Sequence, residues 1–238
     1  MQDCGKLGGL RPEATERQRI LCSDCVQRPR CLPARLDARA LSRFQEALEQ
    51  SGTLPAGQTL VCAGSPVRAF FALQYGAVKS LHCNANGMEQ VVAFHFPGSV
   101  LGLHEPASTA WSCTHVALED TQVCRIPPQA LNKELRRRLA ELIRGNLQKE
   151  YEFHLKLADC SATQRLAAFL LRLYEGVASP SLHFLLPMSR LDIASYMGLT
   201  QAALHQGFKE LDVFGWVRTR GQEVDIRDLA GLRRFDRN

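Results

Sequence analysis

The spacing of apolar residues changes abruptly near Pro128, and this change limits the possible folds more than any other feature. Between Thr53 and Pro127, short apolar runs alternate with turn signals such as PAGQ, NANG and FPGS. That pattern is typical of closely spaced antiparallel strands in a sandwich or roll. After Pro128 the chain runs to Leu157 without another proline, which predicts a single helix of about 30 residues.

Helical spacing also flanks these two regions. Residues 34–50 predict a short amphipathic helix, and residues 162–174 predict another. In residues 189–213, Ser189 is positioned to cap a helix, Gly198 permits a tight turn and Thr200 caps a second helix. This order is typical of a helix-turn-helix.

Two short alternating segments around Gly221 follow and predict a wing. The expected fold class is therefore α+β, with an N-terminal β roll like that of cyclic-nucleotide-binding domains, a long dimerisation helix and a C-terminal winged helix-turn-helix. The expected organisation is a cysteine-rich leader and cluster loop (1–33), a sensory β roll (34–127), a dimerisation helix (128–158) and a winged helix-turn-helix domain (159–238).

Charge and composition exclude little by themselves. A formal net charge of +5 permits a polyanionic partner without requiring one. No apolar run is long enough to span a membrane, and the N-terminus lacks the features of a secretory signal. We therefore expect a cytoplasmic protein without a membrane partner. The sequence shows neither a Ser, His and Asp arrangement nor a glycine-rich phosphate loop, so we do not expect an enzyme.

Nine cysteines are many for 238 residues. Cys22, Cys25 and Cys31 form a C-x2-C-x5-C segment, in which a short loop can wrap three thiolates around one centre. Iron–sulfur clusters and zinc both take four ligands, so another cysteine would have to come from elsewhere. The candidates are Cys4, Cys62, Cys83, Cys113, Cys124 and Cys160. A third interpretation of this segment is a C-x-x-C redox pair, formed by Cys22 and Cys25. The thioredoxin-like sequence context that such a pair normally needs is missing.

The long helix carries a 3,4,3,4 spacing that is typical of a coiled-coil seam. Its seam residues would form the dimer interface, and they are Ala140, Ile143, Leu147, Glu150 and His154. Across a two-fold axis Glu150 would face its own copy, and two like charges at close range repel. We therefore expect Glu150→Ala to make the protein dimerise even when no metal centre is bound. The alternative is that this helix packs only on its own sheet.

From about Ile20 to Leu232, the chain resembles the CRP/FNR superfamily of bacterial transcription regulators, and its cysteine pattern resembles the oxygen-sensing FNR branch. The matching stretches include PAGQTL, ALEDTQVCRIP, QRLAAFL and MSRLDIASYMGLT, together with the cysteine segment. The resemblance implies that Cys124 is the fourth ligand, so that Cys22, Cys25, Cys31 and Cys124 hold a [4Fe–4S] cluster.

The resemblance also implies a mechanism. The cluster would sense oxygen or nitric oxide, hold two chains together as a homodimer and so control binding to a two-fold DNA site through the major groove. RNA polymerase would be a further partner. The cyclic-AMP branch binds its phosphate with an arginine that is missing from residues 98–112. Because an anionic phosphate is costly to bury without a cation, control by a cyclic nucleotide is disfavoured.

Two departures from the family pattern stand out. Arg28 and Arg30 occupy cluster-loop positions where small or apolar residues are common in the family, which would alter the sensitivity of the cluster. Ala202, His205 and Gln206 replace the E-x-x-S-R pattern in the helix that reads DNA, so we expect a non-standard operator. The predicted DNA-binding residues are Arg190, Thr200, Gln201, His205, Gln206, Lys209, Arg218 and Arg220. The alternative is an adaptor with weakened DNA binding that acts through other proteins.

Overall fold

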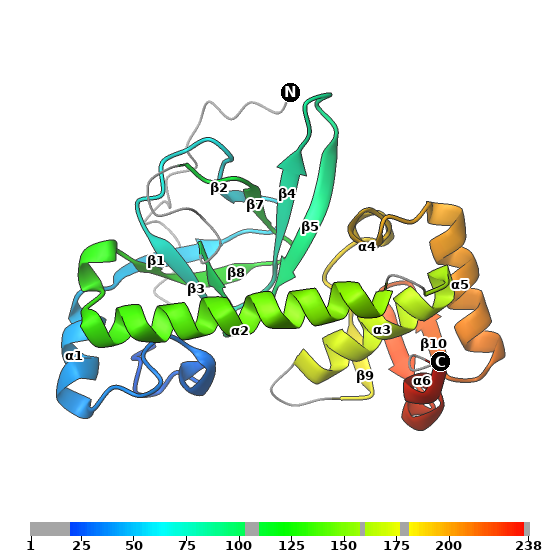
Figure 1. The fold of residues 1–238 in the computed structure, drawn as a ribbon. Coiled ribbons are helices and arrows are strands. Elements are labelled where there is room, and N and C mark those ends of the chain that lie inside the picture. Colours follow the sequence, from blue (N-terminus) through cyan, green and yellow to red (C-terminus); the bar gives the residue numbers. More distant parts are fainter. Residues whose placement is uncertain (1–19, 103–109, 158–159, 177–180, 236–238) are drawn as a thin grey trace. The chain divides into compact units, whose positions relative to one another are not determined.

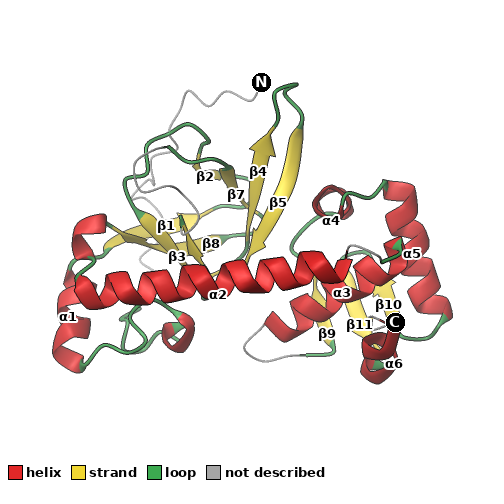
Figure 2. Ribbon diagram, viewed as in Figure 1, coloured by secondary structure: helices red, strands yellow, loops and turns green. Residues whose placement is uncertain are grey.

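The structure is a computed structural model that describes residues 20–102, 110–157, 160–176 and 181–235. The chain divides into two compact units, Met1–Leu147 and Gln148–Asn238, and each is described by itself. Figure 1 follows the chain through both units, and Figure 2 shows their helices and strands. None of the helices in the described ranges is long and apolar enough to cross a membrane.

The N-terminal unit contains two four-stranded antiparallel sheets, as expected for a β roll. One sheet has the order β1-β8-β3-β6, from β1 (Glu49–Leu54), β8 (Thr121–Ile126), β3 (Phe70–Tyr75) and β6 (Val100–Leu101). The other has the order β2-β7-β4-β5, from β2 (Thr59–Val61), β7 (Thr114–Ala117), β4 (Val78–Cys83) and β5 (Glu89–His95). Phe71, Val78 and Trp111 contribute to an apolar core that draws residues from both sheets.

The turn signal NANG, which contains Asn86-Gly87, joins β4 to β5 in an antiparallel hairpin. Its turn is longer than a two-residue loop, because the last pair joins Cys83 to Glu89. Of Asn86 and Gly87, only Gly87 adopts a positive φ, of 78°. The Asn84 side chain accepts hydrogen bonds from the backbone N–H groups of Asn86 and Met88, each at 3.0 Å, and so holds the turn.

A second apolar core lies on the other face of the β1-β8-β3-β6 sheet. Side chains alternate between the two faces of a strand, so Phe71 faces the first core while Ala72 faces the second. Leu41 and Phe44 of α1 (Ala38–Glu46) and Leu135 of α2 (Lys133–Leu157) cover this face. Figure 1 shows the blue segment that contains α1 beside the start of α2.

Helix α1 and helix α2, the latter with residues in both units, are each shorter than the sequence pattern predicts. The first begins after Asp37, whose side chain accepts from the N–H of Ala40, and it ends before strand β1. The second begins at Lys133 and not at Pro128, because residues 128–130 form a 3-10 turn, η2 (Pro128–Ala130). The Asn132 side chain then accepts from the N–H of Leu135 and caps the helix.

The C-terminal unit contains the expected winged helix-turn-helix. Its helices are α3 (Ala162–Gly176), α4 (Arg190–Met197), α5 (Gln201–Val213) and α6 (Leu229–Phe235), the last of which the sequence analysis did not predict. A three-stranded antiparallel sheet has the order β10-β11-β9, from β10 (Val217–Arg220), β11 (Glu223–Ile226) and β9 (His183–Leu185). The two expected wing strands correspond to β10 and β11.

The predicted caps of the helix-turn-helix are confirmed. Ser189 and Asp192 form a reciprocal capping box at the start of α4. Gly198 ends this helix with a φ of 64°, a left-handed conformation that glycine adopts without steric cost. Thr200 then caps α5 by accepting from the N–H of Ala203. The recognition helix of the motif is therefore α5.

Candidate thiolate centre and nucleic-acid interface

The cysteine loop, residues 22–31, is anchored to the rest of the N-terminal unit. The N–H of Cys22 donates to Oε1 of Gln45 in α1 at 2.8 Å. At the other end of the loop, residues 28–30 form a 3-10 turn, η1 (Arg28–Arg30). A Cβ at Gly98 would lie only 3.3 Å from the Gln27 side chain, so this glycine allows the loop to approach the turn after β5 closely.

Strand β8 brings Cys124 to the same place. Cys124 pairs with Ala72 across the sheet, and cross-strand partners face the same side, so its side chain points to the second core. Cys22 is buried in that core, and Cys31 and Cys124 pack against it. Residues that are 93 positions apart in the chain thus meet on one face of the sheet.

The electrostatics of the thiols link all four predicted ligands. Burial raises the pKa of Cys124 to about 12, and negative charge on Cys22, Cys31 and Cys25 raises it further. Burial likewise raises the pKa of Cys31 to about 12, with additional upward effects from Cys22 and Cys25. Burial, and then the charge of Cys25, raises the pKa of Cys22. The raised pKa values of Cys22, Cys31 and Cys124 mean that these three groups favour the protonated thiol at neutral pH.

This donor set fits a centre that prefers soft thiolate ligands. Within the described ranges, however, no three or more His, Cys, Asp or Glu side chains are gathered into a ready coordination sphere. A bound centre would therefore have to draw the sulfurs together and displace their protons. Cys4 and residues 103–109, part of the stretch considered for nucleotide binding, lie outside the described residues.

The first half of α2 shares its packing with the cysteine loop. Leu131 and Leu135 are buried in the second core, and Leu139, Leu142 and Ile143 pack against it. Glu141 of α2 forms ion pairs with Arg138 at 3.2 Å and with Arg35, just after the loop, at 3.5 Å. Arg138 also lowers the pKa of Cys31, in opposition to the larger effect of burial. The cysteine loop and the first half of α2 therefore pack on the same apolar core.

The predicted seam residues occupy different environments along α2. Ala140, Leu147 and His154 are exposed, whereas Ile143 is partly buried against the second core. Two further apolar side chains, Tyr151 and Leu155, are 65% and 58% exposed. Sequence analysis missed this pair because it followed the 3,4 spacing through Glu150 and His154.

Glu150 is not an isolated charge. Both of its carboxylate oxygens accept from the Arg172 guanidinium, with Nη1 at 3.1 Å from Oε2 and Nη2 bonded to Oε1. The same guanidinium lies over the Phe153 ring, 4.5 Å from its centroid. Pairing with Arg172 opposes the expectation that Glu150 repels its copy, because the two side chains together carry no net charge.

The recognition helix α5 has one buried and one exposed face. Leu204, Gly207, Phe208 and Leu211 are buried. The predicted base-reading residues are all exposed, and they are Gln201, His205, Gln206 and Lys209. Gly207 faces α3: a Cβ there would lie 3.2 Å from Cδ2 of Leu166. The glycine that weakens the helix therefore allows close packing of α5 on α3.

Arg190 makes its contacts within the chain. Its guanidinium lies 3.6 Å from the centroid of the Phe208 ring, and Nη2 donates to the carbonyl of Gly221 at the wing tip, 2.9 Å away. Burial lowers its pKa, and its Nη1 is buried without a hydrogen-bond partner. Arg190 thus connects α4, α5 and the wing, a role that the sequence prediction of a phosphate contact did not include.

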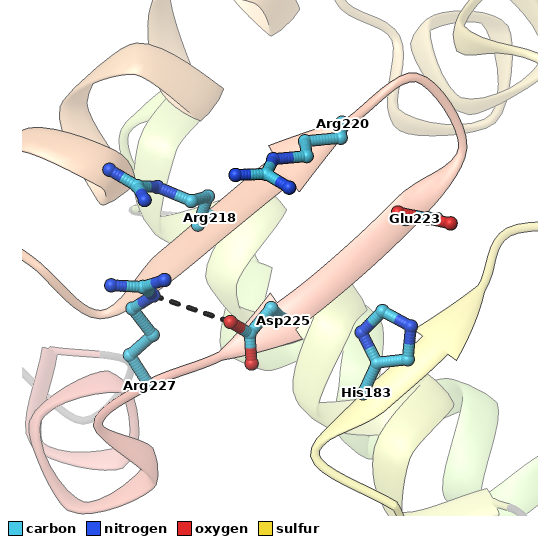
Figure 3. Close-up of a pocket in the computed structure, with 6 residues that line it drawn as sticks. All are labelled: His183, Arg218, Arg220, Glu223, Asp225 and Arg227. Atoms are coloured by element: carbon cyan, nitrogen blue, oxygen red, sulfur yellow. Dashed lines mark hydrogen bonds and ion pairs between the residues drawn. The ribbon is translucent and has the colours of Figure 1, made fainter.

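The exposed face of the wing sheet forms an open pocket, shown in Figure 3. Three arginines line it with a histidine and two carboxylates; these residues are His183, Arg218, Arg220, Glu223, Asp225 and Arg227. Arg218 pairs across the strands with Asp225, and Arg220 with Glu223, so these side chains share one face. Arg227 binds Asp225 at 3.3 Å. The predicted phosphate contacts Arg218 and Arg220 therefore lie among acidic groups that offset part of their charge.

A β roll followed by a long helix and a winged helix-turn-helix defines a class of bacterial DNA-binding regulators. Residues 52–138 match the family model of the cyclic nucleotide-binding domain, and residues 164–235 match that of the Crp-like helix-turn-helix domain. The chain belongs to the CRP/FNR family of transcription regulators. Regulators of this type bind DNA and act as dimers, and they are not enzymes.

Individual relatives cover nearly the whole chain. The transcriptional activator protein FnrA of Stutzerimonas stutzeri is 30% identical over 220 residues, covering 89% of this chain and 90% of that protein. The anaerobic regulatory protein of Haemophilus influenzae is 29% identical over 222 residues, covering 90% and 86% respectively. The solved structure of FixK2 from Bradyrhizobium japonicum has a TM-score of 0.71 and 25% identity, and the match covers 79% of this chain and 97% of that one.

Proposed function

We propose that this chain is an oxygen- or nitric-oxide-responsive transcription regulator in which a [4Fe–4S] cluster controls dimerisation and DNA binding. Cys22, Cys25 and Cys31 from the loop and Cys124 from β8 would hold the cluster. The observation that carries the proposal is that the cysteine loop and Cys124 of β8 lie at the same apolar core. The relationship to an anaerobic regulatory protein supports the same reading.

When bound, a cluster of this kind supplies iron and sulfide that react with oxygen. The chain would couple the state of the cluster to the packing of α2. The loop, β8 and the first half of α2 all pack on the second core, so the cluster would hold the loop in place and thereby stabilise the packing of α2. The exposed side chains of Ala140, Leu147 and His154 would then contact a second copy of the chain.

In the dimer, the two recognition helices would enter successive major grooves of a two-fold site. Gln201, His205, Gln206 and Lys209 lie on the exposed face of α5, where they would reach base edges. None of these residues is an arginine, the side chain that most often reads guanine. We therefore propose an operator that differs from the usual one of the family. Contact with RNA polymerase stays a prediction.

Anaerobic purification tests the proposed centre. We expect a brown protein with about four iron and about four sulfide ions per chain, the stoichiometry of one [4Fe–4S] centre. Cys124→Ser should lose most of the iron, whereas Cys83→Ser, which changes an exposed cysteine on β4, should retain it. A colourless protein with stoichiometric zinc would contradict the sensor and identify a structural zinc site. Iron retained in Cys124→Ser would remove this residue from the ligand set.

Selection from a random DNA pool tests the second part of the proposal. The cluster-bound protein should enrich a two-fold sequence, and air-exposed protein should not. If neither form enriches any sequence, the proposed control of DNA binding is wrong. That result would favour the alternative function, an adaptor that acts through other proteins.

A further inference from the structure

A chain of hydrogen bonds connects the recognition helix to α3. The hydroxyl of Thr163, in α3, donates to Oε2 of Glu210 at 2.5 Å. Nε2 of Gln206 donates to the other carboxylate oxygen, Oε1 of Glu210, at 3.1 Å. Thr163 is only 6% exposed, so this end of the hydrogen-bond series lies in the core of the C-terminal unit.

The Glu210 carboxylate fixes the orientation of the Gln206 amide. An ionised carboxylate only accepts hydrogen bonds, so the amide must turn its NH₂ group toward Glu210. The hydrogen bonds from Thr163 and then Gln206 lower the pKa of Glu210, which keeps it ionised. The amide oxygen of Gln206 is left to accept from another donor, and one N–H is left to donate.

We propose that Glu210, held by Thr163, orients the Gln206 amide so that it reads an adenine and rejects a guanine at the position it contacts. This inference rests on the proposed DNA-binding function and specifies its base preference. Adenine presents an amino donor at N6 beside the acceptor N7, which matches an amide oxygen and an N–H. Guanine presents two acceptors, O6 and N7, and would face the amide oxygen with a lone pair.

The hydrogen bond from Gln206 to Glu210 matters because the amide of an unrestrained glutamine can rotate by about 180° and exchange its oxygen and NH₂ positions. With its NH₂ group turned toward the base the amide can donate to O6 or N7 of guanine, whereas it binds adenine through its oxygen and one N–H, so discrimination depends on which end faces the groove. Here a reversed amide would place its oxygen against the Glu210 carboxylate. Glu210 therefore acts as a positioning residue, and Gln206 makes the contact.

The test uses the full-length, cluster-bound protein and the DNA sequence that it enriches from a random pool. Affinity is measured by fluorescence anisotropy at fixed salt for that site and for copies in which each adenine is changed to guanine. Gln206→Ala locates the position that Gln206 contacts, because discrimination there should disappear. In the wild type we expect the guanine copy at that position to bind about 10-fold or more weakly, the range of a good bidentate contact.

Glu210→Gln and Thr163→Val are the decisive variants. Glu210→Gln should reduce the discrimination at that position to less than about 3-fold and leave the ratios at other positions unchanged. Thr163→Val should lie between Glu210→Gln and the wild type. Glu175→Gln is the matched control, because it removes the same charge from an ion pair with Arg233 that lies off the recognition helix. Circular dichroism confirms that each variant folds.

The outcomes separate the two levels of the proposal. Discrimination that is unchanged in Glu210→Gln, or that weakens equally at every position, would overturn the role of Glu210. A selected site at which Gln206→Ala changes no adenine preference would overturn the role of Gln206 while leaving the proposed function intact. A pool in which the wild type enriches nothing would overturn the proposed DNA-binding function and this inference with it.

Discussion

His115 is a buried titratable residue in the β roll. It is 5% exposed, its Nδ1 lies 2.9 Å from the Ser80 hydroxyl, and its Nε2 is buried without a hydrogen-bond partner. Burial lowers the pKa of His115 to about 4, because the charged ring would lose its hydration. The histidine is thus neutral in the folded protein near pH 7, and it becomes charged more readily once the chain unfolds.

This shift predicts a loss of stability in acid. Between about pH 6.5 and pH 4 the unfolded chain binds a proton at His115 that the folded chain does not, so the stability of the roll falls as the pH falls through this window. The full effect is on the order of 3 kcal/mol. Urea unfolding as a function of pH measures it, and His115→Asn should flatten the slope because an asparagine does not titrate, while its amide can still bond to Ser80. An equal slope in both proteins would contradict this account.

Gly207 should resist large side chains. Leu166 and Thr163 of α3 lie close to the position of a Cβ, so leucine at residue 207 would overpack a buried crossing and cost about 1–3 kcal/mol. Gly207→Ala should be nearly neutral, because a gain of about 1 kcal/mol in helix propensity offsets one tight contact. Unfolding followed by Trp216 fluorescence separates the two variants. Equal stability of Gly207→Leu and the wild type would show that α3 gives way at this crossing.

Individual residues also show what the sequence could and could not predict. The caps at Ser189 and Thr200 and the turn at Gly198 were predictable, because they depend on neighbouring residues and on backbone geometry. The partners that α3 supplies to Glu150 and Glu210 were not. Arg172 lies on the next helix, 22 residues from Glu150, and no local pattern marks such a contact.

At the scale of whole elements, the spacing of apolar residues predicted most of the strands and helices but not the residues at which they begin and end. Strand β1 was missed because its residues, EQSGTL, carry no clear alternation of apolar and polar side chains and overlap a predicted helix. Helix α6 was missed for a related reason, since seven residues are too few to establish a period. The start of α2 is set by the Asn132 cap, a local signal that the long helical pattern obscured.

The Glu150–Arg172 pair gives a prediction for helix α2. If α2 forms the dimer seam, Arg172→Met leaves Glu150 unpaired and should weaken the dimer by about 5-fold or more, through repulsion of about 1 kcal/mol between like charges. Adding Glu150→Gln should restore dimerisation, and Glu150→Gln alone should have little effect. The expectation that Glu150→Ala makes the cluster-free protein dimerise did not include Arg172 and stays a prediction.

Sedimentation equilibrium of the cluster-bound proteins measures the effect. Arg233→Met is the control, because it breaks the ion pair between Arg233 and Glu175. The side chains of that pair are partly exposed, as are those of Arg172 and Glu150. An unchanged dimer in Arg172→Met would show that Glu150 does not lie near its copy.

At the scale of the whole molecule, family membership was predictable because it depends on the order of the elements and on several long sequence stretches. The ligand set of the thiolate centre stays a prediction, and the surroundings of its cysteines could not be predicted. The spacing of the loop cysteines indicates a shared ligand site, whereas their burial beside Ala72 and the first half of α2 depends on sheet pairing and on packing between distant segments. That packing connects the proposed sensor to the helix that would form the dimer.

The most direct test follows one anaerobic sample before and after exposure to air. The central claim predicts about four iron ions per chain, a dimer by sedimentation and tight binding to the selected DNA before exposure, with all three lost together afterwards. Cys83→Ser should behave as the wild type does, and Cys31→Ser should behave throughout as the air-exposed protein does. A dimer that binds the same DNA equally well with and without iron would contradict the claim.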